Sequence, residues 1–329
     1  MRVGDPLDTC LPGGDAATDA LARTVLALAG AAAELSHLVS RGALEGALGA
    51  EIGEGHEAGD AQRALDVVAD DLFFRALADA PVAAVASEER EGVVVLDERA
   101  PLAVAVDPLD GSSNIDINAP VGAIFSIMDA ARDAPAEAPF LAPGTRQRAA
   151  GIVVFGPATT MLLSVGRGVD LHVLDRASGA FRLARADVRV PVSAKEFAIN
   201  ASNRRHWEPG LEAWFEHCLA GRDGPLARDH NMRWIASLVA ETFRIFTRGG
   251  VYLYPADQRK GYERGRLRLV YEGKPVAFLT EQAGGLATDG RRRILDLEAG
   301  SLHERCPFVF GSREMVETIG SYLSGSRPG

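Results

Sequence analysis

Residues 102–114 read LAVAVDPLDGSSN, an apolar run that ends in Asp107 and Asp110. A second apolar run, VAAVA, comes shortly before it in the chain and ends in Glu88 and Glu89. Short apolar runs without clear alternation are typical of strands that are covered on both faces. Because ligands bind beyond the carboxyl ends of strands in open α/β sheets, we expect the four acids to meet in one crevice.

The chemistry of these acids favours divalent metal ions. Carboxylates that lie close together raise one another's pKa or require cations. A ligand set made only of oxygens, with no histidine or cysteine nearby, favours Mg²⁺ or Mn²⁺ over Zn²⁺. The turn adds the Leu109 carbonyl as a ligand, while Gly111, Ser112 and Ser113 offer N–H groups and hydroxyls to a bound anion. A lone Asp-x-x-Asp-Gly is more often a solvated turn, but the neighbouring acid pair favours the metal site.

The composition is that of a globular protein. The chain has 329 residues, 47% of them hydrophobic, which is enough to bury a sizeable core. Its net charge of −10 opposes nucleic-acid binding, and neither a signal peptide nor an apolar membrane segment is evident, so we expect a cytoplasmic protein. Cys10, Cys218 and Cys306 form neither a disulfide framework nor a metal motif.

The remaining pattern is α/β, with a soft domain boundary near residue 190. Expected helices are a pair within residues 15–50, then Leu65–Ala80, Trp207–Leu219, Trp234–Thr247 and Pro275–Ala283. Expected strands are Val82–Ala86, Val93–Leu96, Leu102–Val106, Gly151–Phe155, Thr160–Val165, Val169–Leu174 and Val251–Tyr254. The proline- and alanine-rich stretch Asp133–Thr145 is expected to be a surface loop.

DPLDGSSN at Asp107–Asn114, preceded by SEE, resembles the signature of the lithium-sensitive, metal-dependent sugar phosphatases. The longer stretch DPLDGSSNIDINAPVGAIFSI is similar to the class I fructose-1,6-bisphosphatases, as are GGVYLYP (249–255), GRLRLVYE (265–272) and EQAGGLATDG (281–290). The similarity runs from about residue 18 to the C-terminal end. It implies a layered αβαβα fold with mixed sheets, in which residues 1–190 carry the metal shell and residues 191–329 carry the sugar and 6-phosphate pocket.

The resemblance also implies the catalytic residues. The implied metal shell consists of Glu88, Glu89, Asp107, the Leu109 carbonyl, Asp110 and Glu272, and it holds two or more Mg²⁺ ions per subunit. GDAQRALDVVADD matches the family's mobile catalytic loop and places Asp60 and Asp66 at its acidic positions, where helix caps or exposed acids are otherwise commoner. The expected reaction is in-line attack of a metal-activated water on the sugar's 1-phosphate, with Asp66 or Glu89 accepting the proton.

A second, metal-free pocket would bind the 6-phosphate. By resemblance it consists of Asn200, Asn203, Arg233, Tyr252, Tyr254 and Arg266, with Arg233 contributed by a neighbouring subunit of a homotetramer. Asn203 and Arg266 stand where the commonest animal pattern has tyrosine and lysine, and Trp234 also replaces a tyrosine. Trp234 is expected to pack rather than to contact the ligand.

Two further sequence features bear on regulation and on the metabolic pathway. Pro101 and Leu102 replace the lysine–tyrosine pair of AMP-binding members, so AMP inhibition is expected to be weak or absent. The cysteine-free loop before residue 145 resembles bacterial enzymes of carbon-fixing organisms, which indicates gluconeogenesis or the Calvin cycle.

Three alternatives remain open. A sedoheptulose-1,7-bisphosphatase, or an enzyme that acts on both sugars, would keep every catalytic residue. An inositol monophosphatase would lack Arg233 and GRLRLVYE, which disfavours it. A catalytically inactive regulator would be expected to lose an acid from the metal shell, and none is lost.

Overall fold

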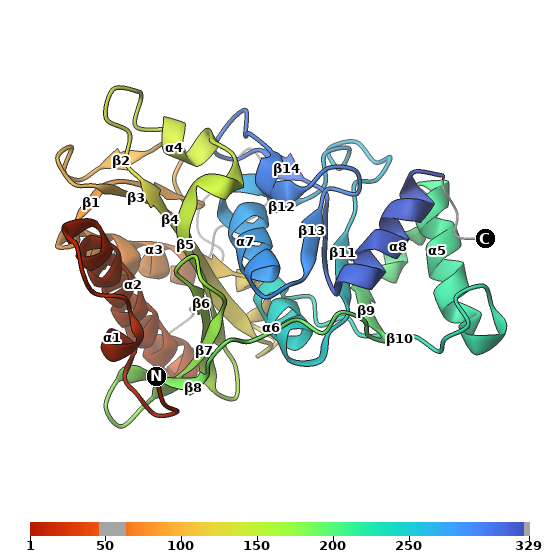
Figure 1. Ribbon diagram of the computed structural model, residues 1–329, viewed down its shortest axis with the longest axis horizontal. Helices are drawn as coiled ribbons and strands as arrows, with labels where there is room; N and C mark the ends of the chain where they lie inside the picture. Colours follow the sequence, from red (N-terminus) through yellow and green to blue (C-terminus); the bar gives the residue numbers. More distant parts are fainter. Residues whose placement is uncertain (46–63, 326–329) are drawn as a thin grey trace.

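The computed structural model describes residues 1–45 and 64–325, and its elements stack in five layers, α/β/α/β/α (Figure 1). The first helical layer contains α2 (Ala16–Arg41) and α3 (Ala64–Ala78), the middle layer α6 (Leu238–Arg248) and α7 (Lys274–Gln282), and the last layer α5 (Pro209–Leu219) and α8 (Arg313–Leu323). The predicted αβαβα fold is confirmed.

Both sheets are mixed, as predicted. The first sheet has eight strands in the order β2 (Val94–Val95), β1 (Val82–Ser87), β3 (Leu102–Asp110), β4 (Val121–Asp129), β5 (Gln147–Phe155), β6 (Thr159–Ser164), β7 (Asp170–Asp175) and β8 (Ala180–Arg185). Its β1 and β3 are parallel, and its other pairs are antiparallel. The second sheet has the order β10 (Asn231–Met232), β9 (Glu196–Ile199), β11 (Val251–Tyr254), β15 (Phe308–Gly311) and β13 (Leu286–Thr288).

Short elements connect the layers. They are α1 (Leu7–Cys10), α4 (Ala138–Leu141), the pair β12 (Leu267–Arg268) and β14 (Arg305–Cys306), the 3₁₀ turns η1 (Gly42–Glu45), η2 (Ser112–Asn114), η3 (Gly144–Arg146), η4 (Ala201–His206), η5 (Gly221–Asp223) and η7 (Ile294–Asp296), and the π-helical turn η6 (Leu269–Gly273).

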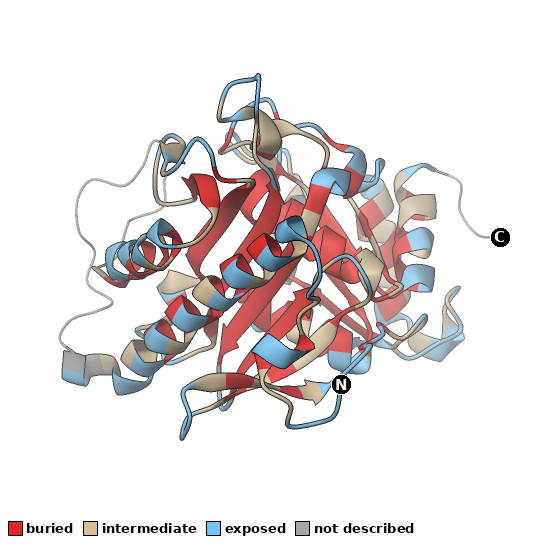
Figure 2. Ribbon diagram, turned by 60° about the vertical axis from the view of Figure 1, so that its left-hand side comes forward, coloured by how far each residue is buried: buried red, intermediate tan, exposed pale blue. Residues whose placement is uncertain are grey.

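Strand β3 is buried along its whole length, which explains its continuous apolar sequence. Its larger side chains, such as Val104 and Val106, join the core on the side of α2 and α3, while Ala103 and Ala105 join the core between the two sheets. Figure 2 shows both sheets as buried interior beneath helices that expose one side. The small alanine side chains give the middle layer room to approach the strand that carries the acids.

A glycine on β4 lets α6 approach the first sheet closely. Gly122 pairs with Asp110 across the β3–β4 ladder. A Cβ atom at this position would lie 2.1 Å from the Val153 carbonyl oxygen and 2.7 Å from Cγ2 of Val239 on α6. Only glycine therefore allows the first turn of α6 to lie against the sheet beside Asp110.

Helix α2 is apolar enough, by length and composition alone, to cross a membrane. In the fold its buried face, which includes Val25, Leu28 and Leu35, packs against α3 and strands β5 and β8. The helix is thus an integral part of the first layer.

Several elements differ from the sequence-based expectations. Residues 16–41 form one helix where a pair was expected within residues 15–50, of which 46–50 lie outside the described part of the chain. The expected helix at Trp234 begins at Leu238, because the Ser237 side chain caps it by accepting from the Ala240 N–H. Strands β4, β8, β9, β13 and β15 and helix α8 were not predicted.

The stretch Asp133–Thr145 is not entirely loop. It contains the single helical turn α4, whose end is held by Lys274. The Lys274 ammonium group donates to the carbonyl oxygens of Phe140 (3.1 Å) and Ala142 (2.7 Å), and burial lowers the pKa of this lysine to about 8.

Candidate active site

The acids that follow the two apolar runs lie at neighbouring strand ends. Strands β1 and β3 are parallel, with Ser87 opposite Val106, and the Glu88 N–H extends the ladder by donating to the Val106 carbonyl oxygen at 3.0 Å. Strand β3 continues through Asp107 to Asp110, with an irregularity in its pairing to β4 between these two residues. Both aspartates are consequently buried beside the end of β1.

Three of the acids form a compact cluster. One carboxylate oxygen from each of Asp107, Asp110 and Glu272 lies within 4.8 Å of the others, and all three residues are buried. Glu272 belongs to η6, a π-helical turn directly before α7, and the Arg268 N–H donates to its carboxylate at 2.5 Å. Single π-helical turns occur frequently at functional sites.

The cluster carries more negative charge than a buried site can hold without cations. Burial, and then the charges of Glu88, Asp110 and Glu272, hold the pKa of Asp107 well above its usual range. Burial and the charge of Glu88 raise the pKa of Asp110 to about 7, although the Val239 N–H opposes this change. Burial and repulsion from Asp110 and Glu88 likewise raise the pKa of Glu272. The Arg268 guanidinium, 3.0 Å from Glu88, offsets part of this charge.

Oxygen donors of this kind fit a hard divalent cation. The donors are carboxylates from two segments, β3 and η6, and their raised pKa values report the electrostatic cost that a bound cation would remove. Leu109, between the two aspartates, is buried, and its N–H donates to Asp107 at 3.1 Å.

The turn after Asp110 is tied to the start of α6. Gly111 adopts φ +79°, a conformation that favours glycine, and leads into the turn η2 that contains Ser112 and Ser113. Asn114 at the end of η2 donates to the Ala236 carbonyl oxygen at 2.8 Å. The Val239 N–H at the start of α6 donates to Asp110 at 3.1 Å. The turn therefore lies beside a helix N-terminus, an environment suited to anions.

The catalytic acids implied by the resemblance are Asp60, Asp66 and Glu89. Asp66 lies in the first turn of α3 and is buried, with 2% of its surface exposed. Glu89 follows Glu88, and its N–H donates to the Ser87 hydroxyl at 3.3 Å. Asp60 lies outside the described residues.

An aromatic cluster borders the acids. Trp234 stacks on Tyr252 with ring centroids 5.8 Å apart, and Tyr254 lies 6.2 Å from Tyr252. Burial raises the pKa of Tyr252 well above its usual range, and the charges of Tyr254, Asp110 and Glu272 add to this. The tyrosine pair is therefore close enough to the acid cluster to interact with it electrostatically. Trp234 packs against Tyr252, as expected.

Three other residues predicted for the second pocket lie on neighbouring segments. Strands β9 and β11 are parallel neighbours, so Asn200, directly after β9, lies near the end of β11, where Tyr254 is found. Asn203 follows in η4, where its N–H donates to the Asn200 carbonyl oxygen. Arg266 hydrogen-bonds Tyr254, which opposes the rise in pKa that burial causes for that tyrosine, and stacks on the Tyr262 ring at 4.7 Å.

Arg233 lies at the edge of the second sheet. It follows the edge strand β10, and its side chain is 47% exposed. Its Nε donates to Glu196 at 2.9 Å. The neighbouring apolar residues Met232 and Ile235 are also exposed.

Comparison with known proteins identifies the family. A family model for the fructose-1-6-bisphosphatase N-terminal domain matches residues 14–186, and the model for its C-terminal domain matches residues 190–324. The chain belongs to the fructose-1,6-bisphosphatase family. The resemblance seen in the sequence is therefore confirmed.

Relatives of this family support the class I assignment. A "Fructose-1,6-bisphosphatase class 1" of Methylobacterium radiotolerans is 53% identical over 331 residues, which cover 99% of this chain and 94% of the relative. A protein with the same description from Rhodopseudomonas palustris (strain HaA2) is 52% identical over 97% of this chain and 93% of its own. The solved structure of Leishmania major fructose-1,6-bisphosphatase in holo form matches with a TM-score of 0.89 at 30% identity, covering 98% of this chain and 99% of that one.

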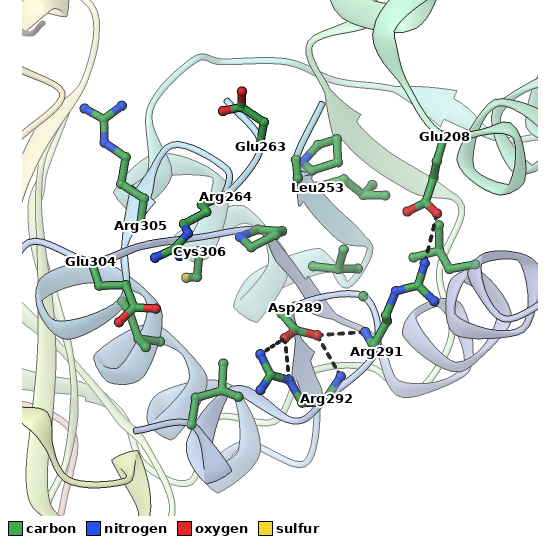
Figure 3. A pocket seen from close by; sticks show the side chains of 18 of the residues that line it. Glu208, Leu253, Glu263, Arg264, Asp289, Arg291, Arg292, Glu304, Arg305 and Cys306 are labelled. Atoms are coloured by element: carbon green, nitrogen blue, oxygen red, sulfur yellow. Dashed lines mark hydrogen bonds and ion pairs between the residues drawn. The ribbon is translucent and has the colours of Figure 1, made fainter. Parts of the chain in front are cut away.

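A cavity of about 790 Å³ elsewhere in this fructose-1,6-bisphosphatase fold is distinct from the candidate site (Figure 3). It is lined by Leu253, which precedes Tyr254 on β11, and by none of the predicted site residues. Two of its arginines are already paired, Arg292 with Asp289 at 3.0 Å and Arg291 with Glu208 at 3.3 Å.

Two residues at the site were not recognised from the sequence. Arg268 lies within GRLRLVYE, where the sequence alone indicates no role for it, yet it contacts Glu88 and Glu272. Its place four residues before Glu272 in a motif typical of fructose-1,6-bisphosphatases was the available signal. Glu196, the partner of Arg233, lies outside the sequence motifs that resemble the family.

Proposed function

We propose that this chain hydrolyses the 1-phosphate of fructose 1,6-bisphosphate and releases fructose 6-phosphate and inorganic phosphate. The observation that carries the proposal is the buried cluster of Asp107, Asp110 and Glu272 beside the Tyr252–Tyr254 pair, in a chain of this family. The acids suit a phosphate that is neutralised by cations. The adjoining tyrosines and arginines suit a phosphate that is bound without them.

The family is metal-dependent, and Mg²⁺ is the proposed ion, with Mn²⁺ as a substitute and two or more ions per subunit. The residues that would hold them are Glu88, Glu89, Asp107, Asp110 and Glu272, together with the Leu109 carbonyl. Such ions supply charge neutralisation of the phosphate and a lowered pKa for water.

The chain's own residues would bind the 1-phosphate and accept the proton that the attacking water releases. Glu89 and Asp66 are the proposed proton acceptors, and Asp66 is buried in the first turn of α3. Asp60 is proposed to act with them by resemblance. Gly111, Ser112 and Ser113 would donate hydrogen bonds to the phosphate oxygens from the turn that the α6 N-terminus supports.

The 6-phosphate would bind at the opposite end of the sugar. The proposed contacts are Asn200, Asn203, Tyr252, Tyr254 and Arg266, joined by Arg233 of a neighbouring subunit. Exposed Met232 and Ile235 beside Arg233 support an interface at this edge of the second sheet.

The assembly and location form part of the same proposal. The enzyme is proposed to be a cytoplasmic homotetramer whose subunits comprise residues 1–190 and 191–329 as two α/β domains. The division is supported by the first sheet ending at Arg185 and the second beginning at Glu196. Light scattering at assay concentrations would contradict the assembly if it gave the mass of a monomer.

The decisive experiment is phosphate release with Mg²⁺, with and without EDTA. Fructose 1,6-bisphosphate, sedoheptulose 1,7-bisphosphate and inositol 1-phosphate are compared side by side. Release from the first substrate that EDTA abolishes supports the proposal, and its ratio to the second gives the breadth for sugar length. No release from any of the three would refute the proposed reaction.

A further inference from the structure

A single carboxylate gathers three guanidinium groups beside the second pocket. Glu196, at the start of β9, accepts from Arg233 Nε at 2.9 Å and from Arg248 Nη2 at 2.5 Å through one oxygen, and from Arg244 Nη1 at 3.1 Å through the other. Burial opposes ionisation of Glu196, but the bonds from Arg233 and Arg244 and the charge of Arg248 outweigh it, so the pKa of Glu196 is lowered. The group is therefore a carboxylate at neutral pH.

The carboxylate is held rigidly on its inner side. Arg244 is buried, and its Nε donates to Glu241 at 2.8 Å in addition to its bond with Glu196. Glu241 is itself fully buried on α6, and its other oxygen accepts from the Ile235 N–H at 2.8 Å. Glu196 thus belongs to a network that joins β9, α6 and the segment carrying Arg233.

Arg233 is restrained at three points by these same elements. Its own N–H donates to the Phe197 carbonyl oxygen at 2.8 Å, and the Ile235 N–H two residues later is held by Glu241. The third point is the bond from its Nε to Glu196. Because the carboxylate takes Nε, the terminal nitrogens of the guanidinium keep the forked donor arrangement that suits a phosphate.

We propose that Glu196 is a positioning residue: it fixes the Arg233 guanidinium to bind the second phosphate, and so favours sugar bisphosphates over sugar monophosphates. This inference rests on the proposed function, in which Arg233 contacts that phosphate across a subunit interface. An arginine side chain loses much rotamer freedom when it binds, and holding it in place beforehand removes part of that cost.

A purely structural role is the competing explanation, because Glu196 also neutralises the buried Arg244. The two roles have different kinetic consequences. Loss of a structural pair would lower stability and affect all substrates alike. Loss of positioning would raise KM only for a substrate that has the second phosphate.

The test is the variant Glu196→Gln, which keeps the side-chain size and one acceptor oxygen but removes the charge. Kinetics are measured with fructose 1,6-bisphosphate and with fructose 1-phosphate, which lacks the second phosphate. We expect KM for the bisphosphate to rise about tenfold with kcat nearly unchanged, and both constants for fructose 1-phosphate to stay the same. Glu212→Gln, which weakens the exposed pair with Arg204, is the matched control and should change neither.

A double-mutant cycle with Arg233→Met distinguishes failure of the proposed role of Arg233 from failure of the positioning role of Glu196. If Glu196 acts through Arg233, the double variant should match Arg233→Met alone. If Arg233→Met leaves the bisphosphate KM unchanged, the proposed role of Arg233 fails. If Arg233→Met raises that KM while Glu196→Gln leaves it unchanged, the positioning role alone is overturned. The same conclusion follows if Arg233→Met raises that KM but Glu196→Gln changes the kinetics of both substrates equally.

Should Glu196→Gln unfold at the assay temperature, Glu196→Asp provides the same test. The shorter side chain keeps the negative charge near the buried Arg244 but draws the carboxylate back from Arg233 Nε, so the same rise in the bisphosphate KM is expected. An unchanged KM in a folded Glu196→Asp protein would overturn the proposal.

Discussion

Replacing Asp110 with asparagine should stabilise the metal-free protein while removing a proposed metal ligand. Asparagine has nearly the same shape, and its carbonyl oxygen can still accept from the Val239 N–H, which now donates to Asp110 at 3.1 Å. What changes is the charge. In the metal-free fold, burial and Glu88 raise the pKa of Asp110 to about 7, from 3.8 for an ordinary aspartate.

The size of the effect follows from the difference between the two pKa values. Between about pH 4 and pH 7 the folded carboxyl group keeps a proton that the unfolded chain releases, so the free energy of unfolding decreases as pH rises through this range. A difference of about three pH units, at about 1.4 kcal/mol each, gives about 4 kcal/mol at pH 8. This is an upper bound, because the asparagine amide must also be desolvated.

Thermal unfolding in EDTA at pH 8 and pH 5 measures the effect. At pH 8 the variant should melt several degrees above the wild type, and the gap should shrink at pH 5, where the wild-type carboxyl is protonated in the fold. Asp229→Asn, which weakens an exposed pair with Arg222, should instead lower stability slightly, since the pKa of Asp229 is lowered. A variant that melts below the wild type in EDTA at pH 8 would refute the reasoning.

Two further substitutions test the surroundings of the cluster. Arg268→Met removes the guanidinium 3.0 Å from Glu88 and should lower the free energy of urea unfolding in EDTA by about 3 kcal/mol. Added Mg²⁺ should restore part of this loss. A variant as stable as the wild type in EDTA would contradict the role given to Arg268. Gly122→Ala would place a Cβ 2.1 Å from the Val153 carbonyl oxygen and should cost about 3 kcal/mol and most of the activity, whereas Gly92→Ala, with open space around its Cβ, should be tolerated. Normal activity in Gly122→Ala would show that α6 need not approach the sheet so closely.

The part of the site that contains Glu88, Asp107 and Asp110 could be predicted from local sequence. Acids after two apolar runs predicted a crevice at neighbouring strand ends, and β1 and β3 are indeed parallel neighbours. Glu272 could be placed only by resemblance, because nothing local links η6 to β3, more than 150 residues earlier; that contact depends on how the middle layer packs between the sheets.

Some missed elements carried readable signals. In β8, buried Phe181 and Leu183 alternate with more exposed neighbours, which is the pattern of a strand covered on one face. In α8, the spacing of Met315, Ile319 and Tyr322 is helical.

The network around Glu196 had no such signal. Arg233 follows β10, and the other two arginines, Arg244 and Arg248, lie on α6. The pairing of β9 with β10 and the packing of α6 bring all three to Glu196. A pairing that depends on tertiary structure in this way cannot be found by spacing along the chain.

The position of the cleaved phosphate tests the central claim most directly. Fructose 1,6-bisphosphate is incubated with the protein and Mg²⁺, and ³¹P NMR identifies the sugar monophosphate that remains. If the acid cluster takes the 1-phosphate and the tyrosine–arginine pocket holds the other end, the product is fructose 6-phosphate and none forms in EDTA. Accumulation of fructose 1-phosphate, or turnover that EDTA does not affect, would contradict the account.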